Sequence, residues 1–404
     1  MRIDDSRRNF LKIAGVAGSL PLLSSRLVFA QAVPTPRDVL VVIFQRGGMD
    51  GLNAVVPYGD GDYYDRRGAV AIAETEVIAL PGDNRFGLHP SLDLLRPLYE
   101  AGELALVHAV GGPTHSRSHF SCQDLMERAV FDGSGAPSGW LNRHLVSRGP
   151  ASDFQGVGIG TAVPRSLSGI APVLGISTFD DFALLSTSSR SDELAATLNL
   201  LHPESGGLDA VARSAFSAMA ELETADPGQH APAHGAVYPA TPFGRQLLQI
   251  AQLIKAGVGL EIATVDIGGW DHHDDELNRL APLLAEFGQG IAAFRADLGA
   301  AMAGVSLVSM SEFGRRAEPN ASGGTDHGTA NCMFVLGGGV VGRKVYADWP
   351  GLATADLADG DLAITTDYRA VLSELLRKRR GETALPDVFP GYADPLELGL
   401  FRHA

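Results

Sequence analysis

The sequence predicts an α/β protein built on a doubly wound, mostly parallel sheet with helices on both faces. Three observations support this fold class: unbroken apolar runs, glycines directly after most of these runs, and helical periodicity in the segments between them. Apolar runs without polar alternation are typical of strands that are buried on both faces of a sheet. Strands that alternate with helices favour a parallel sheet covered on both sides.

Five segments have the composition of buried strands. The first, residues 38–44, is almost wholly apolar and is followed by Gly47 and Gly48. In open α/β sheets the chemistry lies at the carboxyl ends of the strands, so the polar residues that follow these segments are the candidates for a site. The other four strands are expected at 104–110, 260–267, 305–310 and 332–336.

Between and beyond these strands, apolar residues recur at the spacing of helices. We expect residues 33–404 to form a single domain with a flexible excursion near 225–240, where three prolines lie among glycines and alanines. The helices are expected at 120–130, 192–201, 208–222, 243–256, 277–302 and 368–378.

The N-terminus predicts export by the twin-arginine route. Arg7 and Arg8 precede a short apolar run, and the small residues Ala30 and Ala32 offer a cleavage site. A membrane-spanning helix would need about 20 apolar residues, whereas glycines, a proline and Arg26 interrupt this run. We therefore expect residues 1–32 to be removed, no transmembrane segment in the mature chain, and a periplasmic or otherwise exported protein.

The charge balance excludes one class of partner and permits another. The net charge is −15, and the basic signal makes the mature chain more acidic still. A negative field of this kind repels phosphate backbones, so no nucleic-acid partner is expected. A small anionic substrate remains possible because a bound divalent cation can dominate its own site.

The two cysteines do not form a disulfide framework. Cys122 and Cys332 lie far apart in the sequence, and one pair over such a distance could form only in an oxidising compartment. We favour two buried thiols.

The segment Thr325-Asp326-His327-Gly328 offers adjacent carboxylate and imidazole ligands. Asp supplies a hard oxygen and His a borderline nitrogen, which together fit zinc or manganese. The alternative is a turn in which Asp326 accepts backbone hydrogen bonds and His327 is incidental.

A second polar cluster, residues 266–275, follows the predicted strand at 260–267. Six of its ten residues are Asp or His, a concentration of charge that is costly unless a cation neutralises it. A solvated helix N-terminus explains Asp274 and Asp275, because acidic residues favour the helix dipole there. It explains Asp271 and His273 less well.

Two further clusters follow strands. Ser116, Arg117 and Ser118 precede a predicted helix, where a serine could act as a nucleophile and the arginine could hold an anion. Ser118 could equally serve as an ordinary N-cap. Asp50 follows the glycines after the first strand and could reach a metal, although such a turn alone is a weak signal.

Together these motifs resemble a twin-arginine-exported bacterial family, the domain of unknown function numbered 1501. The resemblance covers nearly the whole mature chain. The motifs that carry it are Arg-Gly-Gly-x-Asp-Gly-Leu-Asn at 46–53, Ser-Arg-Ser-His-Phe at 116–120, Gly-Trp-Asp at 269–271, Ser-Glu-Phe-Gly-Arg at 311–315 and Gly-Thr-Asp-His-Gly at 324–328.

This family is similar to the alkaline phosphatase-like superfamily, which includes sulfatases and cofactor-independent phosphoglycerate mutases. The resemblance implies one or two divalent metals at the carboxyl ends of the strands, and a nucleophilic hydroxyl, Ser116 or Ser118, at a helix start. The implied metal ligands are Asp50, Asp271, His273, Asp326 and His327.

Two functional hypotheses follow. The first is an exported metal-dependent hydrolase or transferase for a phosphate or sulfate ester, in which Arg117 or Arg315 binds the non-bridging oxygens. The second is a non-catalytic periplasmic binding or assembly factor with an eroded metal site. The spacing favours the second hypothesis, because only His272 separates Asp271 from His273 where the superfamily commonly has three residues.

Overall fold

The computed structural model describes residues 38–404, except 132, 134, 150, 151, 153, 180–216, 219 and 393–395. The predicted signal at 1–32 and the predicted helix at 192–201 therefore lie outside the described residues, as does most of the helix predicted at 208–222.

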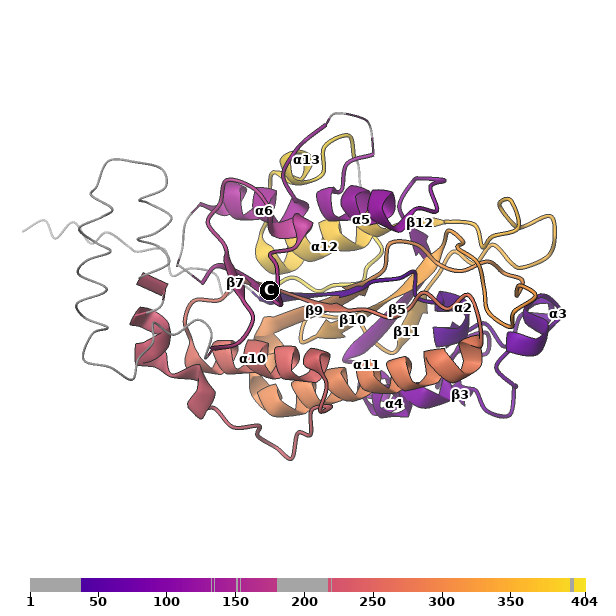
Figure 1. Ribbon diagram of the computed structural model, residues 1–404, viewed down its shortest axis with the longest axis horizontal. Coiled ribbons are helices and arrows are strands. Elements are labelled where there is room, and N and C mark those ends of the chain that lie inside the picture. Colours follow the sequence, from indigo (N-terminus) through magenta and orange to yellow (C-terminus); the bar gives the residue numbers. More distant parts are fainter. Residues whose placement is uncertain are drawn as a thin grey trace, which may run out of the picture. The chain divides into compact units, whose positions relative to one another are not determined.

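A nine-stranded sheet forms the centre of the described chain (Figure 1). Its strand order is β11-β5-β10-β9-β1-β8-β6-β7, and β12 also pairs with β5. All five strands predicted from the sequence are present, and the short strands β6, β7, β11 and β12 were not predicted. The strands are β1 (Val39–Gln45), β5 (Leu104–Gly111), β6 (Gly156–Ile159), β7 (Leu174–Ile176), β8 (Ile262–Ile267), β9 (Val305–Met310), β10 (Asn331–Gly337), β11 (Lys344–Tyr346) and β12 (Thr366–Asp367).

One strand of this sheet, β10, runs against its neighbours. It pairs antiparallel with both β5 and β9, whereas every other pairing in the sheet is parallel. Asn331 at the start of β10 is therefore opposite Val110 near the end of β5. The loop before β10 consequently reaches the same edge of the sheet as the loops that follow the parallel strands.

Helices cover both faces of the sheet, which confirms the predicted fold class. Figure 1 shows α4, α10 and α11 on one side and α5, α6, α12 and α13 on the other. The helices are α2 (Gly51–Ala54), α3 (Gly61–Arg67), α4 (Arg96–Glu100), α5 (His119–Arg128), α6 (Trp140–Arg148), α10 (Pro242–Ala256), α11 (Glu276–Leu298), α12 (Tyr368–Arg380) and α13 (Leu385–Val388).

The apolar runs become central strands because both of their faces are buried. Along β1, Val41 and Ile43 pack into the core beneath α10 and α11, whereas Leu40 and Val42 pack into the core beneath α6 and α12. All four side chains are at most 3% exposed. The central strands thus contribute side chains to two cores, one on each face of the sheet. Burying each aliphatic side chain stabilises the fold by about 1.5–3 kcal/mol.

Local signals set the ends of the helices. Thr241 caps α10 by accepting a hydrogen bond from the backbone of Gly244, and α10 ends at Ala256, directly before Gly257, whose φ is +69°. Such a left-handed end favours glycine, which has no Cβ. The helix predicted to run to Met302 stops at Leu298, because Gly299 takes a φ of +49° and a 3₁₀ turn, Gly299–Gly304, follows.

The segment predicted as a flexible excursion near 225–240 contains a 3₁₀ turn, Pro227–Gln229. Asp297 of α11 holds it by accepting hydrogen bonds from the backbone of Ala233 and from the Tyr238 hydroxyl.

A small antiparallel sheet of β2 (Val55–Val56), β4 (Gly87–Leu88) and β3 (Ile78–Ala79) lies outside the central one.

Cys122 and Cys332 are both buried and free, as expected. No helix within the described ranges is both long enough and apolar enough to cross a membrane.

Candidate metal centre

Several loops meet at one edge of the central sheet. Four different loops take part: they follow β1, β5, β8 and β9, and the loop after β9 leads into the antiparallel β10. Two glycines allow the loops to touch: a Cβ on Gly47 would lie 2.8 Å from the backbone nitrogen of Asp271, and one on Gly324 would lie 2.2 Å from the carbonyl carbon of His273. Any larger residue at Gly47, after β1, or at Gly324, in the loop before β10, would force these loops apart.

Arg315 ties the loops together from inside the protein. Its side chain is 1% exposed, and its guanidinium donates to the backbone oxygens of Gly48, Trp270 and Thr325. It also donates to the Asp271 carboxylate at 2.7 Å. Because its N–H groups bond to other parts of the protein, the buried Arg315 orients the loops of the site. The prediction that Arg315 binds the oxygens of a substrate is therefore wrong.

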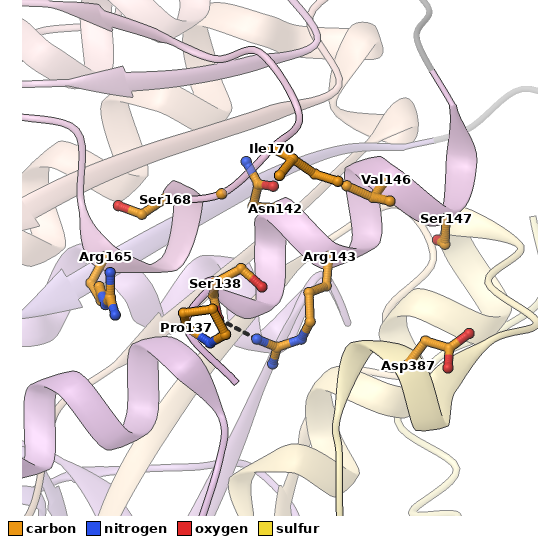
Figure 2. A pocket seen from close by; sticks show the side chains of 11 residues that line it. Pro137, Ser138, Asn142, Arg143, Val146, Ser147, Arg165, Ser168, Ile170 and Asp387 are labelled. Atoms are coloured by element: carbon orange, nitrogen blue, oxygen red, sulfur yellow. Dashed lines mark hydrogen bonds between the residues drawn. The ribbon is translucent and has the colours of Figure 1, made fainter. Parts of the chain in front are cut away.

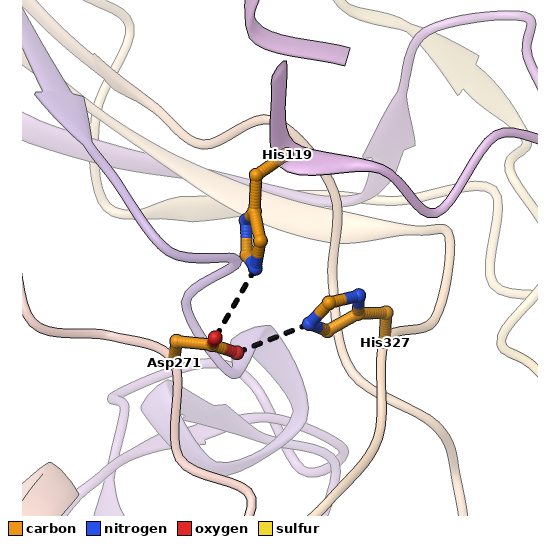
Figure 3. Close-up of side chains that lie close together, drawn as sticks. All are labelled: His119, Asp271 and His327. Carbon is orange, nitrogen blue, oxygen red and sulfur yellow. Dashed lines mark hydrogen bonds and ion pairs between the residues drawn. The ribbon is translucent and has the colours of Figure 1, made fainter. Parts of the chain in front are cut away.

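Asp271 contacts three histidines, and Figure 3 shows it with two of them, His119 and His327. Its Oδ2 is 3.3 Å from His119 Nε2, and its Oδ1 is 3.1 Å from the Nε2 atoms of both His327 and His273. Partial burial acts to raise the pKa of Asp271, but the hydrogen bond and charge of Arg315 outweigh it and lower the pKa to about 2. Asp271 is therefore a carboxylate at neutral pH.

Each of the three imidazoles is fixed through its other nitrogen. His119 Nδ1 contacts the Glu312 carboxylate at 2.8 Å, and His273 Nδ1 contacts Asp326 at 2.9 Å. His327 Nδ1 contacts the backbone carbonyl of Arg117 at 2.8 Å. Carboxylates and carbonyls only accept hydrogen bonds, so in neutral rings the Nδ1 atoms carry the protons.

The opposite ring nitrogens then present lone pairs to one another and to Asp271. His273 Nε2 and His327 Nε2 are 3.0 Å apart, and His119 Nε2 is buried without a hydrogen-bond partner among the described residues. The lone pairs of His119 and His327 converge with the Asp271 carboxylate, the His273 lone pair lies beside that of His327, and no ring supplies a proton donor there. Such a set is satisfied by a cation, and imidazoles oriented through Nδ1 by carboxylates or carbonyls are the usual arrangement of metal-binding histidines.

The distances also fit a transition metal. In tetrahedral zinc sites with bonds of about 2.0–2.1 Å, neighbouring ligand atoms lie about 3.3 Å apart. The contacts of Asp271 with the three histidines span 3.1–3.3 Å. One ligand atom each from His119, Asp271 and His327 lies within 4.8 Å of the other two. These residues fit a divalent metal, with His273 as a further ligand or as a support for His327.

Four of the five predicted ligands lie together here. Asp271, His273 and His327 present atoms to the cluster, and Asp326 orients His273 from behind. His272 is 4% exposed and turned into the protein, so Asp271 and His273 both reach the cluster although only one residue separates them.

The fifth predicted ligand, Asp50, lies apart in a buried ion pair. It is 2% exposed and accepts a hydrogen bond from Arg67, which is fully buried on α3. Arg67 also donates to Glu276, at 3.3 Å, and to the backbone carbonyl of Arg316, at 2.9 Å. Thr325 donates to Glu276 at 2.6 Å. The guanidinium thus supplies the cation that was expected to be a metal near Asp50.

Two buried carboxyl groups share this one arginine, and their pKa values are shifted in opposite directions. Burial, with the charge of Asp50, raises the pKa of Glu276 well above the usual 4.5, although Arg67 and Thr325 oppose the rise. The pKa of Asp50 is lowered: burial acts to raise it, and Arg67 outweighs burial. A protonated Glu276 can then donate to an ionised Asp50.

This arrangement predicts an unusual pH dependence. The folded-state pKa of Glu276 exceeds the unfolded value near 4.5, so the folded state binds more protons between the two values. The contribution of Glu276 to stability is complete below the unfolded value and is lost as the pH rises through the folded one. Denaturant titrations of chelator-treated protein from pH 5 to 9 should show this loss in the wild type and a flatter profile in Glu276→Gln. Parallel profiles would contradict the assignment.

Two residues of the site were not predicted as site residues, His119 and Glu312. Both lie just beyond predicted strands, which was the signal that could have found them. Glu312 is 2% exposed and accepts from the backbone of Gly47 and from the side chains of His119 and Gln123, all within 2.9 Å.

The predicted catalytic segment 116–118 borders the cluster. Ser118 is exposed at the N-cap position of α5 but makes no capping hydrogen bond with its side chain. The Ser116 hydroxyl accepts from the backbone of Ser118 at 3.3 Å. Arg117 gives its carbonyl to His327 and its guanidinium to Asp361, at 2.5 Å. The structure brings these residues beside the histidines, but among the described residues neither serine hydroxyl forms a hydrogen bond with a histidine of the cluster.

The family model of the protein family of unknown function DUF1501 matches residues 107–373. The match spans more than half of the sequence and includes every histidine of the cluster. The chain belongs to this family. No curated protein sequence matches the chain.

Two solved structures resemble the chain distantly. The lipoteichoic acid synthase LtaP from Listeria monocytogenes is 9% identical with a TM-score of 0.33, over 82% of this chain and 74% of that one. The PsFucS1 sulfatase from Pseudoalteromonas sp. is 10% identical with a TM-score of 0.37, over 91% of this chain and 74% of that one. Likeness at this level carries no argument about activity.

Proposed function

We propose that the protein is a metal-dependent hydrolase or transferase that acts on a phosphate or sulfate ester after export by the twin-arginine route. The observation that carries this proposal is the convergence of three Nδ1-protonated imidazoles on the Asp271 carboxylate. Zinc or manganese is the cation that suits two or three imidazole nitrogens and a carboxylate oxygen. When bound, such a metal would act as a Lewis acid toward the ester and lower the pKa of a hydroxyl or water.

The surrounding residues would hold the ester and leave the metal accessible. The side chain of Asp271 is 43% exposed, so the cluster opens to solvent and can admit a substrate. Arg117 is 38% exposed and anchored by the buried Asp361, so its remaining N–H groups can bind non-bridging oxygens of a phosphate or sulfate. The N-terminus of α5 adds a partial positive charge at the same place.

Ser118 is the stronger nucleophile candidate of the two serines. It directly precedes His119, and its hydroxyl is not used as a cap. Ser116, in contrast, accepts a backbone hydrogen bond that orders the turn. Arg117 would bind the anion while the Ser118 oxygen attacks the phosphorus or sulfur, the bond to the alcohol breaks, and the serine proton passes to the leaving alcohol. Water, or an acceptor alcohol in a transferase, would then take the phosphate or sulfate from Ser118.

The proposal predicts a large effect of one small change. Ser118→Ala should lower kcat for an active phosphate or sulfate ester at least about 10³-fold, because the attacking atom is removed, while the metal content stays at the wild-type value. Ser116→Ala is the matched control and should lose less than tenfold. Equal rates for Ser118→Ala and the wild type would exclude this serine as the nucleophile.

A second candidate, a non-catalytic binding or assembly factor, is favoured by a separate cavity. Figure 2 shows this cavity of about 590 Å³ beside α6, near Asp387 of α13. Exposed Val146 and Ile170 line it, and Ile170 is 87% exposed. No residue of the histidine cluster lines it. Exposed apolar surface next to a cavity is typical of sites that bind partners.

A screen of metal-loaded protein separates the two candidates. The hydrolase reading predicts turnover of at least one member of a panel of phosphate and sulfate monoesters and diesters, abolished by His119→Ala. Metal-loaded protein that turns over none of them would remove the hydrolase reading and leave the binding factor.

A further inference from the structure

One histidine of the cluster, His119, lies between two carboxylates. Its Nδ1 is 2.8 Å from Glu312 Oε1. Its Nε2 is 3.3 Å from Asp271 Oδ2 and points toward it (Figure 3). A neutral imidazole carries one proton, so it can donate to only one of these carboxylates. The position of that proton decides whether His119 Nε2 offers a lone pair to a metal or donates a hydrogen bond to Asp271.

The surroundings of the two carboxylates favour the proton on Nδ1. The side chain of Glu312 is fully buried, and no lysine or arginine of the described residues forms an ion pair with it. Asp271, in contrast, is 43% exposed and shares its charge with Arg315 at 2.7 Å. A buried carboxylate without a cationic partner gains more from an N–H donor than a carboxylate that a guanidinium and water already stabilise. Glu312 is therefore the stronger acceptor of the two.

The geometry of His119 agrees with this choice. Its Nε2 is buried and forms no hydrogen bond with any described residue, although Asp271 Oδ2 lies 3.3 Å away. If the proton lay on Nε2 instead, Nδ1 and Glu312 Oε1 would be two acceptors only 2.8 Å apart, which is unfavourable. The ring is thus oriented as a ligand and not as a donor to Asp271.

Glu312 is itself held in place from two sides. Its Oε1 accepts hydrogen bonds from the backbone of Gly47 at 2.9 Å and from the side-chain amide of Gln123 at 2.8 Å. Gln123 lies one turn after His119 on α5, so both side chains reach Glu312 from the same face of the helix. The amide of Gln123 cannot turn round, because its oxygen accepts from Arg46 at 3.3 Å and a guanidinium only donates. The acceptor that faces His119 therefore has a fixed position.

We propose that Glu312 is the positioning residue of the metal centre: it keeps the single proton of His119 on Nδ1 and so prevents His119 and Asp271 from satisfying each other through a hydrogen bond. The inference rests on the proposed function, because it concerns how the ligand atoms of that centre stay available. Without the Glu312 acceptor, the proton would move from Nδ1 to Nε2. His119 would then donate to Asp271, and neither atom would be free for a metal.

Imidazole nitrogen NMR reads the position of the proton directly. The metal-free full chain would be labelled with ¹⁵N-histidine, and spectra would be recorded as the pH is raised until the ring carries a single proton. Comparison with His119→Gln identifies the signals of His119. We expect the proton on Nδ1 in the wild type and in Glu312→Gln, whose amide oxygen still accepts, and on Nε2 in Glu312→Leu. A wild-type ring with its proton on Nε2 would overturn the proposal, and so would an unchanged tautomer in folded Glu312→Leu.

Zinc titrations measure the consequence for the metal centre. Glu312→Leu should weaken zinc binding about 100-fold and Glu312→Gln about tenfold, within the range typical of groups that orient metal-binding histidines. Denaturant titrations would confirm that each variant is folded. Gln123→Leu is the matched control, because it removes a different partner of the same Glu312 oxygen. It should keep the proton on Nδ1 and lose less than about threefold in affinity. A loss as large as that of Glu312→Leu would show that packing around Glu312 sets the affinity and would refute the proposal.

Ester turnover reports separately on the proposed function. A wild-type protein that holds the His119 proton on Nδ1, binds zinc and hydrolyses no ester would count against the hydrolase and support the role of Glu312. An active protein whose His119 carries its proton on Nε2 would do the reverse.

Discussion

Replacing His327 with alanine should weaken metal binding more than about 100-fold and reduce ester hydrolysis about 10³-fold. His327 Nε2 lies 3.1 Å from Asp271 Oδ1 and 3.0 Å from His273 Nε2, so it contacts both of these residues of the cluster. The substitution removes a ligand atom and so weakens metal binding. A bound metal stabilises the charge of the transition state by several kcal/mol, and each 1.36 kcal/mol that is lost lowers the rate about tenfold. Elemental analysis and zinc titration would measure the first effect, and ester turnover the second.

Asp326→Asn is the matched control for this variant. Asp326 is the neighbour of His327 but touches the cluster only through His273. Loss of a carboxylate that orients a metal-binding histidine typically costs about 10–100-fold in metal affinity. The two adjacent substitutions should therefore differ clearly, and a stronger effect of Asp326→Asn would show that the assignment of ligand and support is reversed.

Arg67→Met should destabilise the fold by about 3–5 kcal/mol, because it leaves Asp50 ionised and buried without its partner. Arg67 is fully buried and holds three loops of the site: the Asp50 loop, the start of α11 through Glu276, and the 316–325 loop. Denaturant unfolding followed by tryptophan fluorescence would measure the change.

The neighbouring arginine provides the control for this prediction. Arg66 forms an ion pair with Glu318, whose side chain is 60% exposed, and exposed pairs contribute at most about 1 kcal/mol. Arg66→Met should therefore cost far less than Arg67→Met. Adding Asp50→Asn to Arg67→Met should recover part of the loss, because the unpaired charge is then gone. Equal effects of the two arginine substitutions would contradict the buried network.

The central strands could be predicted because burial on both faces leaves a continuous apolar run. The strands β6 and β7 are short and carry glycines at Gly156, Gly158 and Gly175, so they have no such run. The antiparallel direction of β10 could not be read from its composition, since a strand buried on both faces looks the same in either direction. That direction decides where the loop with His327 lies.

The candidate site was predicted in part because the ends of the buried strands could be located. The rule that chemistry follows strand ends found Asp271, His273, Asp326 and His327. It could not tell which of the neighbours Asp326 and His327 points inward, because this depends on the contacts of His273 and Arg117 across the sheet edge. His119 was missed because the same segment offers Ser116, Arg117 and Ser118 as candidates, and the sequence does not show which of these side chains turns toward Asp271. Asp50 was assigned to a metal because nothing local shows that Arg67 reaches it.

Anomalous diffraction at the zinc edge, from crystals of the full chain loaded with zinc, tests the central claim most directly. We expect a single peak about 2.0–2.2 Å from His119 Nε2, His327 Nε2 and a carboxylate oxygen of Asp271. Loaded crystals without a peak at this position, or with the peak at Asp50 and Glu276 instead, would contradict it.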